Sequence, residues 1–535
     1  MAYIATFDMG TTAVKAVLVS VDDDRIGRSE ALDDDARMEI AASASITLPR
    51  SVEEDGWHEQ DPEDWWHCFI EAWHALTDAL EGMNAGKDAT AGSVVGIILS
   101  GQMQDVITVD SQCRPVRKAI LYSDGRAAHQ AGLLAEAYGE DRFLDVVGNR
   151  CEGSLPLPKL MWLKEHEPQA YADTAHVLFD AKDYIVARLT GSYIGDVTAC
   201  STAGAMNIRT CSWEKPLIAA AGIDIGIFPE LHSPQDIVGR VSRSISALTG
   251  FAQGTAVFAG IGDAGATTLA SAVTKSGEYN INIGTSGWIA GVSEGPITDQ
   301  PGLANLAYAM PEGYINSVPF LNAGGVHGWA TRVFAAGVED SNGDGRSSQQ
   351  DFDRMSGLLE RSVPGSHGVL CLPYLVGERF PVMNADIRGA YVGIGVNTDR
   401  ADMARASLEG VAFSLRQGLE CFDAKAEDIT LVGGGAREGV WCQILADVLG
   451  SRIEVLDNAA VMPAVALSCL VLYTFHEEKR QENGAPVGEG IGRVLGRLRS
   501  QRHGSLYEAK AGAMKLYDAA YERFVRLYPS VNAMQ

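Results

Sequence analysis

The sequence lacks the features that mark several classes of protein. It has no apolar run near the roughly 20 residues of a membrane-spanning helix, and from Met1 it passes into a strand-like segment without a signal-peptide pattern. We therefore expect a cytoplasmic protein with no membrane partner. Its 9 cysteines include no Cys-x-x-Cys pair, which disfavours both a disulfide framework and a zinc site.

Basic residues are scarce relative to acidic ones. The chain has 43 Lys and Arg against 69 Asp and Glu, a formal net charge of −26, and this balance opposes nucleic-acid binding. What is present is an ordinary globular composition, 46% hydrophobic and 21% charged. Because 535 residues exceed what one hydrophobic core usually organises, we predict two large domains with a cleft between them.

Strand and helix patterns alternate along the chain, which predicts an α/β fold. Residues 94–99, for example, resemble a strand and residues 61–80 a helix. The glycine-rich stretch 250–262 favours a domain boundary. We therefore expect a first domain at residues 1–254 and a second at residues 255–535.

The C-terminal segment has an amphipathic pattern. Leu506, Ala513 and Leu516 lie at helical spacing, so they predict one apolar helix face. We expect that helix to pack on the second domain.

Two segments share one pattern. Residues 3–19 and 279–293 each combine two apolar, β-branched arms with a tight Gly-Thr turn. The first turn, Asp-Met-Gly-Thr-Thr at residues 8–12, is echoed by Asn-Ile-Gly-Thr-Ser at residues 282–286. The repetition indicates that the two domains have similar cores.

Each turn offers the groups that a nucleotide phosphate needs, namely backbone N–H groups beside a glycine and side-chain hydroxyls. The candidate ATP-binding residues are Gly10, Thr11 and Thr12 with Lys15 nearby, and Gly284, Thr285 and Ser286. Asp8 precedes the first turn. Because a carboxylate repels a phosphate unless a cation lies between them, we assign Asp8 to Mg²⁺ held with ATP. The alternative, an ordinary hairpin, does not account for the repetition.

A third glycine cluster, residues 433–435, follows a strand-like segment and opens a helix that includes Trp441. Such a turn admits an adenine or a phosphate, although tight strand-to-helix turns use glycine without any ligand. The cluster lacks the Gly-x-Gly-x-x-Gly spacing with a later acidic residue, so a nicotinamide site is unsupported.

Longer patterns make the sequence resemble the FGGY carbohydrate kinases, which share a superfamily with actin, hexokinase and the heat-shock chaperone ATPase. The two family signatures are matched by residues 154–166 and 389–409. Shorter matches to xylulokinases lie at residues 57–62, 101–103, 119–121, 377–379 and 433–437. The resemblance implies two actin-like (ribonuclease H-like) α/β ATPase domains around a cleft, with sugar held mainly by the first and ATP by the second.

The resemblance also implies a catalytic residue and an adenosine site. It assigns the family's catalytic aspartate to Asp263, a general base for the sugar hydroxyl. The alternative for Asp263 is an N-cap of the following helix. Adenosine is expected against Gly434, Gly435 and Ala436.

For the sugar, the resemblance implies contacts from Met103 and Gln104 and from a second segment with Tyr122 and Asp124. Xylulokinases commonly carry histidine where this chain has Gln104, and relatives assigned to ribulose resemble it here. Glutamine still donates and accepts hydrogen bonds, so the pocket stays polar. The alternative for Asp124 is a structural pair with Arg126.

The function so implied is an ATP-dependent kinase of a ketopentose, with D-xylulose phosphorylated to D-xylulose 5-phosphate as the first hypothesis. D-Ribulose kinase or another FGGY sugar or polyol kinase is the alternative in the same family. A different class is an actin-like switch ATPase without a sugar substrate. The expected partners are the sugar and ATP, with Mg²⁺, and a homodimer stays open.

One acidic segment lies outside the family pattern. Its oxygen-bearing residues occupy positions 1, 3, 5 and 12 of a calcium loop, with a glycine at position 6. These candidate Ca²⁺ ligands are Asp340, Asn342, Asp344 and Asp351. The alternative is an acidic surface insertion.

Overall fold

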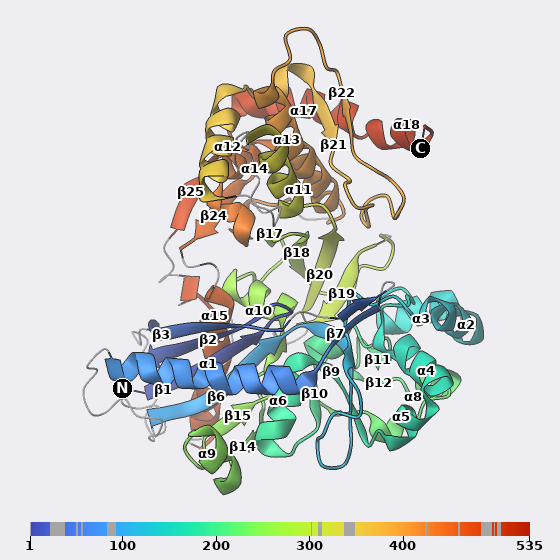
Figure 1. Cartoon of the computed structure of the whole chain (residues 1–535), viewed down its shortest axis with the longest axis vertical. Helices are drawn as coiled ribbons and strands as arrows, with labels where there is room; N and C mark the ends of the chain where they lie inside the picture. Colours follow the sequence, from blue (N-terminus) through green and yellow to red (C-terminus); the bar gives the residue numbers. More distant parts are fainter. Residues whose placement is uncertain are drawn as a thin grey trace.

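A computed structural model describes most of the chain as two α/β domains, a broad one below and a narrower one above in Figure 1. The two-domain α/β prediction is confirmed. The described residues are 2–21, 38–49, 52–54, 57–82, 93–300, 302–308, 313–335, 348–422, 425–457, 459, 461–482, 495–496, 498–499 and 504–534.

The first domain is built on a mixed sheet with strand order β14-β15-β6-β1-β2-β3, and β16 pairs with β6. The strands are β1 (Ala2–Met9), β2 (Ala13–Val21), β3 (Met38–Thr47), β6 (Val94–Gly101), β14 (Ile237–Arg240), β15 (Ala256–Phe258) and β16 (Ile261–Gly262). Because β1 alternates buried side chains, Phe7 joins the core on one face and Ile4 the core on the other. The sheet is therefore covered on both sides.

Helices α1 (Pro62–Gly82) and α6 (Ala181–Thr190) cover one face of this sheet, and α15 (Met462–Glu482) packs on the other beside α10 (Asp263–Ala270). The chain thus returns to the first domain before it forms the last strand of the second. Strands β15 and β16 also follow residue 254 yet pair with β6. The boundary at 254/255 stays a prediction.

A smaller sheet lies beside the first, with strand order β4-β5-β8-β7-β9. Its strands are β4 (Val52–Glu54), β5 (Trp57–Gln60), β7 (Met103–Val109), β8 (Ala119–Ile120) and β9 (His176–Asp180). Helix α4 (Pro156–His166) packs against β7. This layer carries the two segments that we expected to contact the sugar.

The second domain has a sheet of order β19-β20-β18-β17-β23-β24-β25. The strands are β17 (Glu278–Ile283), β18 (Gly287–Ser293), β19 (Ala304–Ala307), β20 (Tyr314–Phe320), β23 (Asp428–Val432), β24 (Arg452–Leu456) and β25 (Gly504–Tyr507). Its main helices are α11 (Gly324–Ala330), α12 (Gln349–Arg361), α13 (Arg400–Leu419), α14 (Gly439–Leu449) and α17 (Ala511–Phe524). Ile281, Ile283 and Trp441 belong to one core between sheet and helices.

The C-terminal helix packs on this domain as expected, since α17 contacts α13 and α14. The apolar face that we predicted for it is wrong, because Leu506 lies in β25 and Leu516 is 56% exposed. Of the three predicted residues only Ala513 is on the buried face, which it forms together with Tyr517, Ala520, Tyr521 and Phe524.

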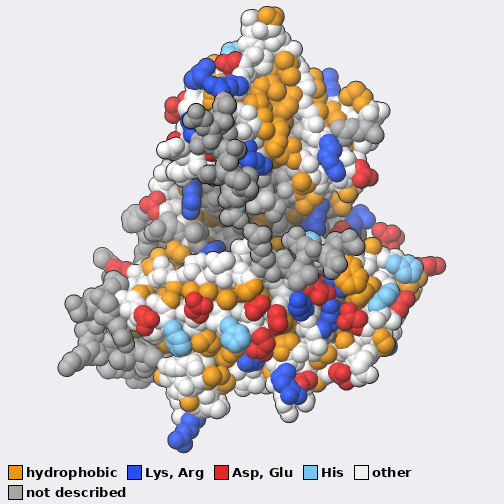
Figure 2. All heavy atoms as spheres, in the orientation of Figure 1, with side chains coloured by type: hydrophobic (Ala, Val, Ile, Leu, Met, Phe, Trp, Pro, Cys, Tyr) orange, Lys and Arg blue, Asp and Glu red, His pale blue; other side chains and the backbone are white. Residues whose placement is uncertain are grey.

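Both predicted hairpins are confirmed, as β1 pairs antiparallel with β2 and β17 with β18. No helix in the described part of the chain is long and apolar enough to cross a membrane. On the face shown in Figure 2, acidic, basic and apolar side chains are interspersed over the described surface of the first domain. The acidic surplus is therefore dispersed on that face rather than gathered in one patch.

Candidate functional site

The first hairpin carries charge at the start of its turn. Asp8 lies opposite Lys15 in the β1–β2 register, and Lys15 Nζ is 3.3 Å from Asp8 Oδ2. Ser100 Oγ, on the parallel neighbour β6, donates to Asp8 Oδ1 at 3.0 Å. The sheet therefore holds the Asp8 carboxylate at the end of a strand, beside one positive charge.

Two glutamines fix the turn that follows. Thr11 Oγ1 donates to Gln102 Oε1 at 2.8 Å, and Gln60 Nε2 donates to the Thr11 carbonyl oxygen at 2.8 Å. Gln102 Nε2 in turn donates to Gln60 Oε1 at 3.2 Å. The turn at residues 10–12 is thus held in one conformation while Thr12 stays exposed.

Asp263 is the first residue of α10 and directly follows β16. Its Oδ1 accepts a hydrogen bond from the Ala264 amide at 2.7 Å, and the N-cap position is taken by Gly262. Burial first, and then the negative charge of Asp8, raise the pKa of Asp263 to about 7, although the Ala264 amide and Lys15 lower it. The fold therefore brings Asp263 within electrostatic reach of the first hairpin.

The two segments expected at the sugar lie near this carboxylate. Met103 is buried beside Gly262, where a Cβ atom would clash with its side chain. Gln104 has a φ of 69°, which is rare for a residue with a side chain, and its Nε2 donates to Ser154 Oγ at 3.1 Å. Tyr122 is 41% exposed.

Charges from both domains act on Tyr122. Burial raises its pKa most, the Thr11 hydroxyl lowers it, and Asp263 and Asp105 raise it. Arg379 of the second domain lowers it. The Tyr122 hydroxyl therefore lies within electrostatic reach of the first hairpin, the Asp263 carboxylate and a cation of the opposite domain.

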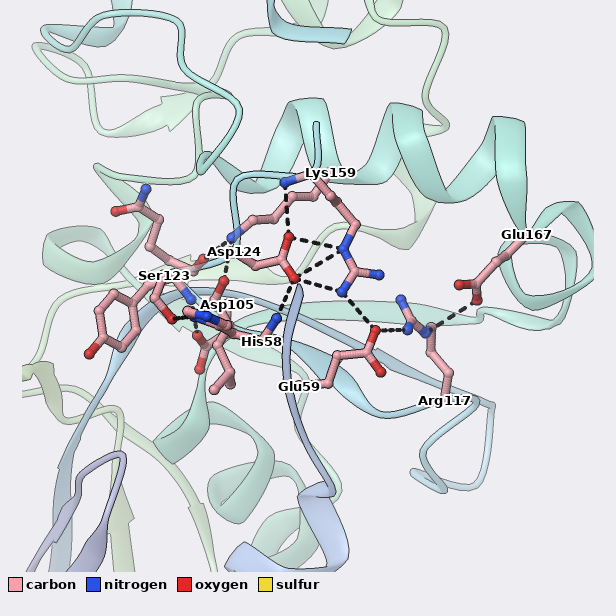
Figure 3. A network of polar contacts seen from close by, with 12 residues as sticks. His58, Glu59, Asp105, Arg117, Ser123, Asp124, Lys159 and Glu167 are labelled. Carbon is pink, nitrogen blue, oxygen red and sulfur yellow. Dashed lines mark hydrogen bonds and ion pairs between the residues drawn. The ribbon is translucent and has the colours of Figure 1, made fainter. Parts of the chain in front are cut away.

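Asp124 is enclosed in an ion-pair network (Figure 3). Its Oδ2 accepts from the His58 amide at 2.7 Å and from Arg126 at 2.6 Å, and its side chain is fully buried. Arg126 continues to Glu59 at 2.8 Å, and Glu59 to Arg117. The pair with Arg126, our alternative for Asp124, is present, and sugar contact by Asp124 stays a prediction.

The second hairpin borders a cavity of about 900 Å³. Gly284 and Thr285 line it, as do Gly434 and Gly435 of the third glycine cluster. Ser286 is exposed in the same turn, and Ala436 packs against the core of the domain. Four of the six residues expected to hold ATP in the second domain thus line one cavity.

Two glycines explain how the backbone closes around this cavity. A Cβ atom on Gly324, at the start of α11, would overlap the Gly284 carbonyl oxygen. Gly433 has a φ of 91°, and a Cβ there would lie 2.5 Å from the Ile283 carbonyl oxygen. Glycine is therefore required where the hairpin, α11 and the loop before α14 meet. These close approaches suit a backbone cradle for a nucleotide.

The sequence interpretation missed the α11 side of the cavity. Asn322, Gly324, Gly325 and His327 all line it. The available signal was the Gly-Gly pair at residues 324–325, which follows the strand-like segment 314–320 after a short link and so resembles the third cluster. Burial lowers the pKa of His327 to about 4, and its ring packs between Phe352 and Trp441, so it is neutral at physiological pH.

Most of the candidate calcium ligands lie outside the described residues, namely Asp340, Asn342 and Asp344. Asp351 is described, and its Oδ2 accepts from the Ser348 amide at 2.8 Å and the Ser348 hydroxyl at 2.7 Å in the capping box of α12. Calcium binding stays a prediction.

Family models match both halves of the chain. The model described as FGGY family of carbohydrate kinases, N-terminal domain, covers residues 3–270, and the C-terminal domain model covers residues 279–465. The chain belongs to the FGGY family of carbohydrate kinases. The switch ATPase without a sugar substrate is thereby rejected.

Individual relatives agree with this assignment. This FGGY kinase is 30% identical to the xylulose kinase of Bacillus subtilis over 86% of its own length and 85% of that protein. It is 28% identical to a gluconokinase of the same organism over 85% of its length and 84% of the relative. A solved structure titled xyloylose kinase from Brucella ovis has a TM-score of 0.82 at 25% identity, covering 100% of both chains.

Family membership makes the enzyme a phosphotransferase with an alcohol group as acceptor, whose substrates are a sugar and ATP with a divalent metal ion. Among the described residues, no group of three or more His, Cys, Asp or Glu side chains gathers as a metal site. Asp8, which precedes the turn that we expect to bind phosphate, stays the candidate carboxylate for the ion.

Proposed function

We propose that this FGGY kinase transfers the γ-phosphoryl group of ATP to a hydroxyl of D-xylulose, giving D-xylulose 5-phosphate. The observation that supports this chemistry is the position of Asp263 directly after Gly262, which pairs with Gly101 and lies against Met103. The negative charge of Asp8 also raises the pKa of Asp263, so this carboxylate is near both the first hairpin and the segment that we expect to bind sugar.

In this proposal Asp263 is the general base. A sugar hydroxyl becomes a better nucleophile as its proton leaves, and Asp263 accepts that proton as the O–P bond forms. Its pKa of about 7 suits this task, because the base is ionised near neutral pH yet basic enough to take the proton. ADP leaves with the electron pair of the broken P–O bond.

The nucleotide is held from both sides. Backbone amides around Gly284 and Thr285 bind the inner phosphates, the cavity beyond them takes adenosine against Gly434 and Gly435, and the first turn faces the transferred group. Bound Mg²⁺ supplies charge neutralisation at the phosphates. Asp8 orients that ion, since its carboxylate would otherwise repel the phosphate beside it.

The choice of sugar rests on the relatives and on the pocket. Seven xylulose kinases at 27–30% identity are among the curated relatives of this chain, and so is a gluconokinase at 28% identity. D-Ribulose is the second candidate, because Gln104 stands where xylulokinases commonly carry histidine and its amide bonds to Ser154. A glutamine pocket recognises hydroxyls without a titrating group.

An ADP-release assay coupled to NADH oxidation tests the proposal across ketopentoses, polyols and sugar acids. We expect the highest kcat/KM with D-xylulose and a product phosphorylated at O5 by ³¹P NMR. A highest value with D-ribulose would support the second candidate instead. The control is Asp263→Asn, which should abolish sugar-dependent ADP release while MgATP still binds.

A further inference from the structure

Two buried charged side chains join the segments assigned to the sugar (Figure 3). Lys159, on α4, donates from Nζ to the Leu121 carbonyl oxygen at 2.7 Å and to the Gln104 carbonyl oxygen at 3.3 Å. Asp105 Oδ1 accepts from the Tyr122 amide at 2.9 Å. The first segment ends at Gln104 and the second begins at Tyr122, so Asp105 and Lys159, which we call the clamp, connect the two segments.

Burial of the two charged side chains of the clamp costs free energy. Both side chains are fully buried, and Asp105 Oδ2 has no hydrogen-bond partner among the described residues. Burial raises the pKa of Asp105 well above its usual range, and burial lowers the pKa of Lys159 to about 8. Two apolar side chains would fill the same space without these penalties. What the pair supplies in exchange is a set of hydrogen bonds to the backbone of both segments.

That geometry is strained at the residue beside it. Gln104 adopts a φ of 69°, and the Lys159 bond to its carbonyl oxygen holds the peptide that follows in this orientation. The Gln104 side chain then reaches Ser154 at 3.1 Å. On the other segment, the amide held by Asp105 belongs to Tyr122, whose side chain responds to Asp263.

The same network has an outer part that lacks these links. Arg117 is paired with Glu59 and lies 3.3 Å from Glu167. In Figure 3 it lies on the side of the network away from Asp105. Arg117 reaches Asp124 only through Glu59 and Arg126, and its loss leaves the bonds of Asp105 and Lys159 to both segments in place, so Arg117 is a matched control.

We propose that Asp105 and Lys159 are positioning residues that set the separation of Gln104 from Tyr122 and thereby determine which sugar the enzyme prefers. The proposal rests on the sugar pocket of the proposed function, but not on the identity of the sugar. A pocket whose two walls are tied together rejects a sugar whose hydroxyls do not match that spacing, because buried polar groups are then left unpaired.

Lys159→Met and Asp105→Val remove the two links while keeping the core apolar. For each variant, kcat/KM is measured for the two best sugars or polyols that the wild-type enzyme phosphorylates, whatever these are. We expect the ratio between them to change by about tenfold, with a higher KM for sugar and a KM for ATP within about twofold of wild type. Asp105→Asn, which keeps an acceptor for the Tyr122 amide, should restore most of the ratio. Arg117→Met should leave it unchanged.

An unchanged ratio in folded Lys159→Met and Asp105→Val proteins would overturn the proposal. A parallel rise of both KM values would do the same, since it indicates general loosening. If Asp105→Val does not fold, Asp105→Glu takes its place, because it keeps the carboxyl but displaces it by one methylene group. A wild-type ratio in that variant also counts against the clamp. Failure of the D-xylulose assignment leaves this comparison intact, because the ratio uses the enzyme's own best acceptors.

Discussion

The two Gly-Thr hairpins have the same backbone plan but different chemistry. In the first, Asp8 lies opposite Lys15, and Ser100 bonds to the carboxylate. In the second, Asn282 occupies the position of Asp8 and lies opposite Trp288. One hairpin therefore presents a charged pair at its turn, and the other an amide and an aromatic ring.

Because of this difference, we expect the two hairpins to have separate roles: metal binding and proton transfer at the first, and nucleotide binding at the second. The charges of Asp8, Lys15 and Asp263 gather at the first hairpin. The cavity at the second hairpin is bordered closely by glycine backbone and by His327, and its charged lining residues, Arg332, Asp353, Arg437 and Glu438, come from elements other than the hairpin. Backbone amides bind phosphate without titrating and without repelling it, whereas carboxylates beside a phosphate require a cation. The first hairpin is thus the place where we expect the metal and the proton transfer.

The largest effect should come from Asp263→Asn. The variant keeps the size of the side chain but removes the basic oxygen, so turnover should fall by about 10²–10⁴ while ATP and sugar still bind. Steady-state kinetics and calorimetric titration measure the two parts separately. Near-normal turnover by a folded variant would overturn the assignment of the base.

The same residue predicts a pH dependence. Asp263 must be ionised to accept a proton, and its pKa is raised to about 7, so kcat/KM should fall as the pH decreases through about 7. Bound Mg²⁺ offsets the negative charge of Asp8, which helps to raise this pKa, and with Mg²⁺ bound the fall should therefore occur at a lower pH. The fall should be absent from the residual activity of Asp263→Asn. A profile that is flat down to pH 5 would contradict the expected basicity.

Exchanging the unlike residues of the two hairpins sharpens the comparison. Asp8→Asn should raise the Mg²⁺ concentration for half-maximal rate by about tenfold or more, because the ion loses a carboxylate. Asn282→Asp should instead raise the KM for ATP, because an uncompensated negative charge then faces the inner phosphates. Mg²⁺ and ATP titrations of both variants measure this. Equal effects of the two substitutions would mean that the hairpins are interchangeable.

Gln104→Ala should act only on the sugar side. Loss of the amide that bonds to Ser154 should lower kcat/KM for the preferred sugar, and the loss should correspond to about 1–3 kcal/mol of transition-state stabilisation. ATP affinity should not change. Ser154→Ala is a matched comparison, because it removes only the partner of that amide. Unchanged sugar kinetics in Gln104→Ala would exclude this residue from the pocket.

The smallest effect on activity is expected from calcium. A Ca²⁺ ion at Asp340, Asn342, Asp344 and Asp351 would give the second domain a charged site of its own, remote in sequence from its hairpin. Isothermal titration with CaCl₂ should give a saturable heat that Asp340→Ala and Asp344→Ala remove, with turnover unchanged. No heat at millimolar Ca²⁺ would leave the segment as an acidic insertion.

Local pattern was sufficient for much of the fold. The hairpins, the strand at residues 94–99 and the helix at residues 61–80 follow from side-chain periodicity, and the structure confirms each. The misassigned tail has a physical reason as well. Helical spacing among Leu506, Ala513 and Leu516 spans a strand and a helix start, and periodicity alone does not detect the break between them.

By itself, the sequence determined many of the elements, the two Gly-Thr hairpins and the family, because these depend on residue type at short spacing. Only the tertiary structure decided which groups share an environment. It enclosed Asp124 with Arg126, brought the α11 glycines to the cavity at the second hairpin, and connected Asp105 and Lys159 to the segments that we expect to bind sugar. Burial and charge proximity come from contacts between residues far apart in the chain, and no local pattern encodes them.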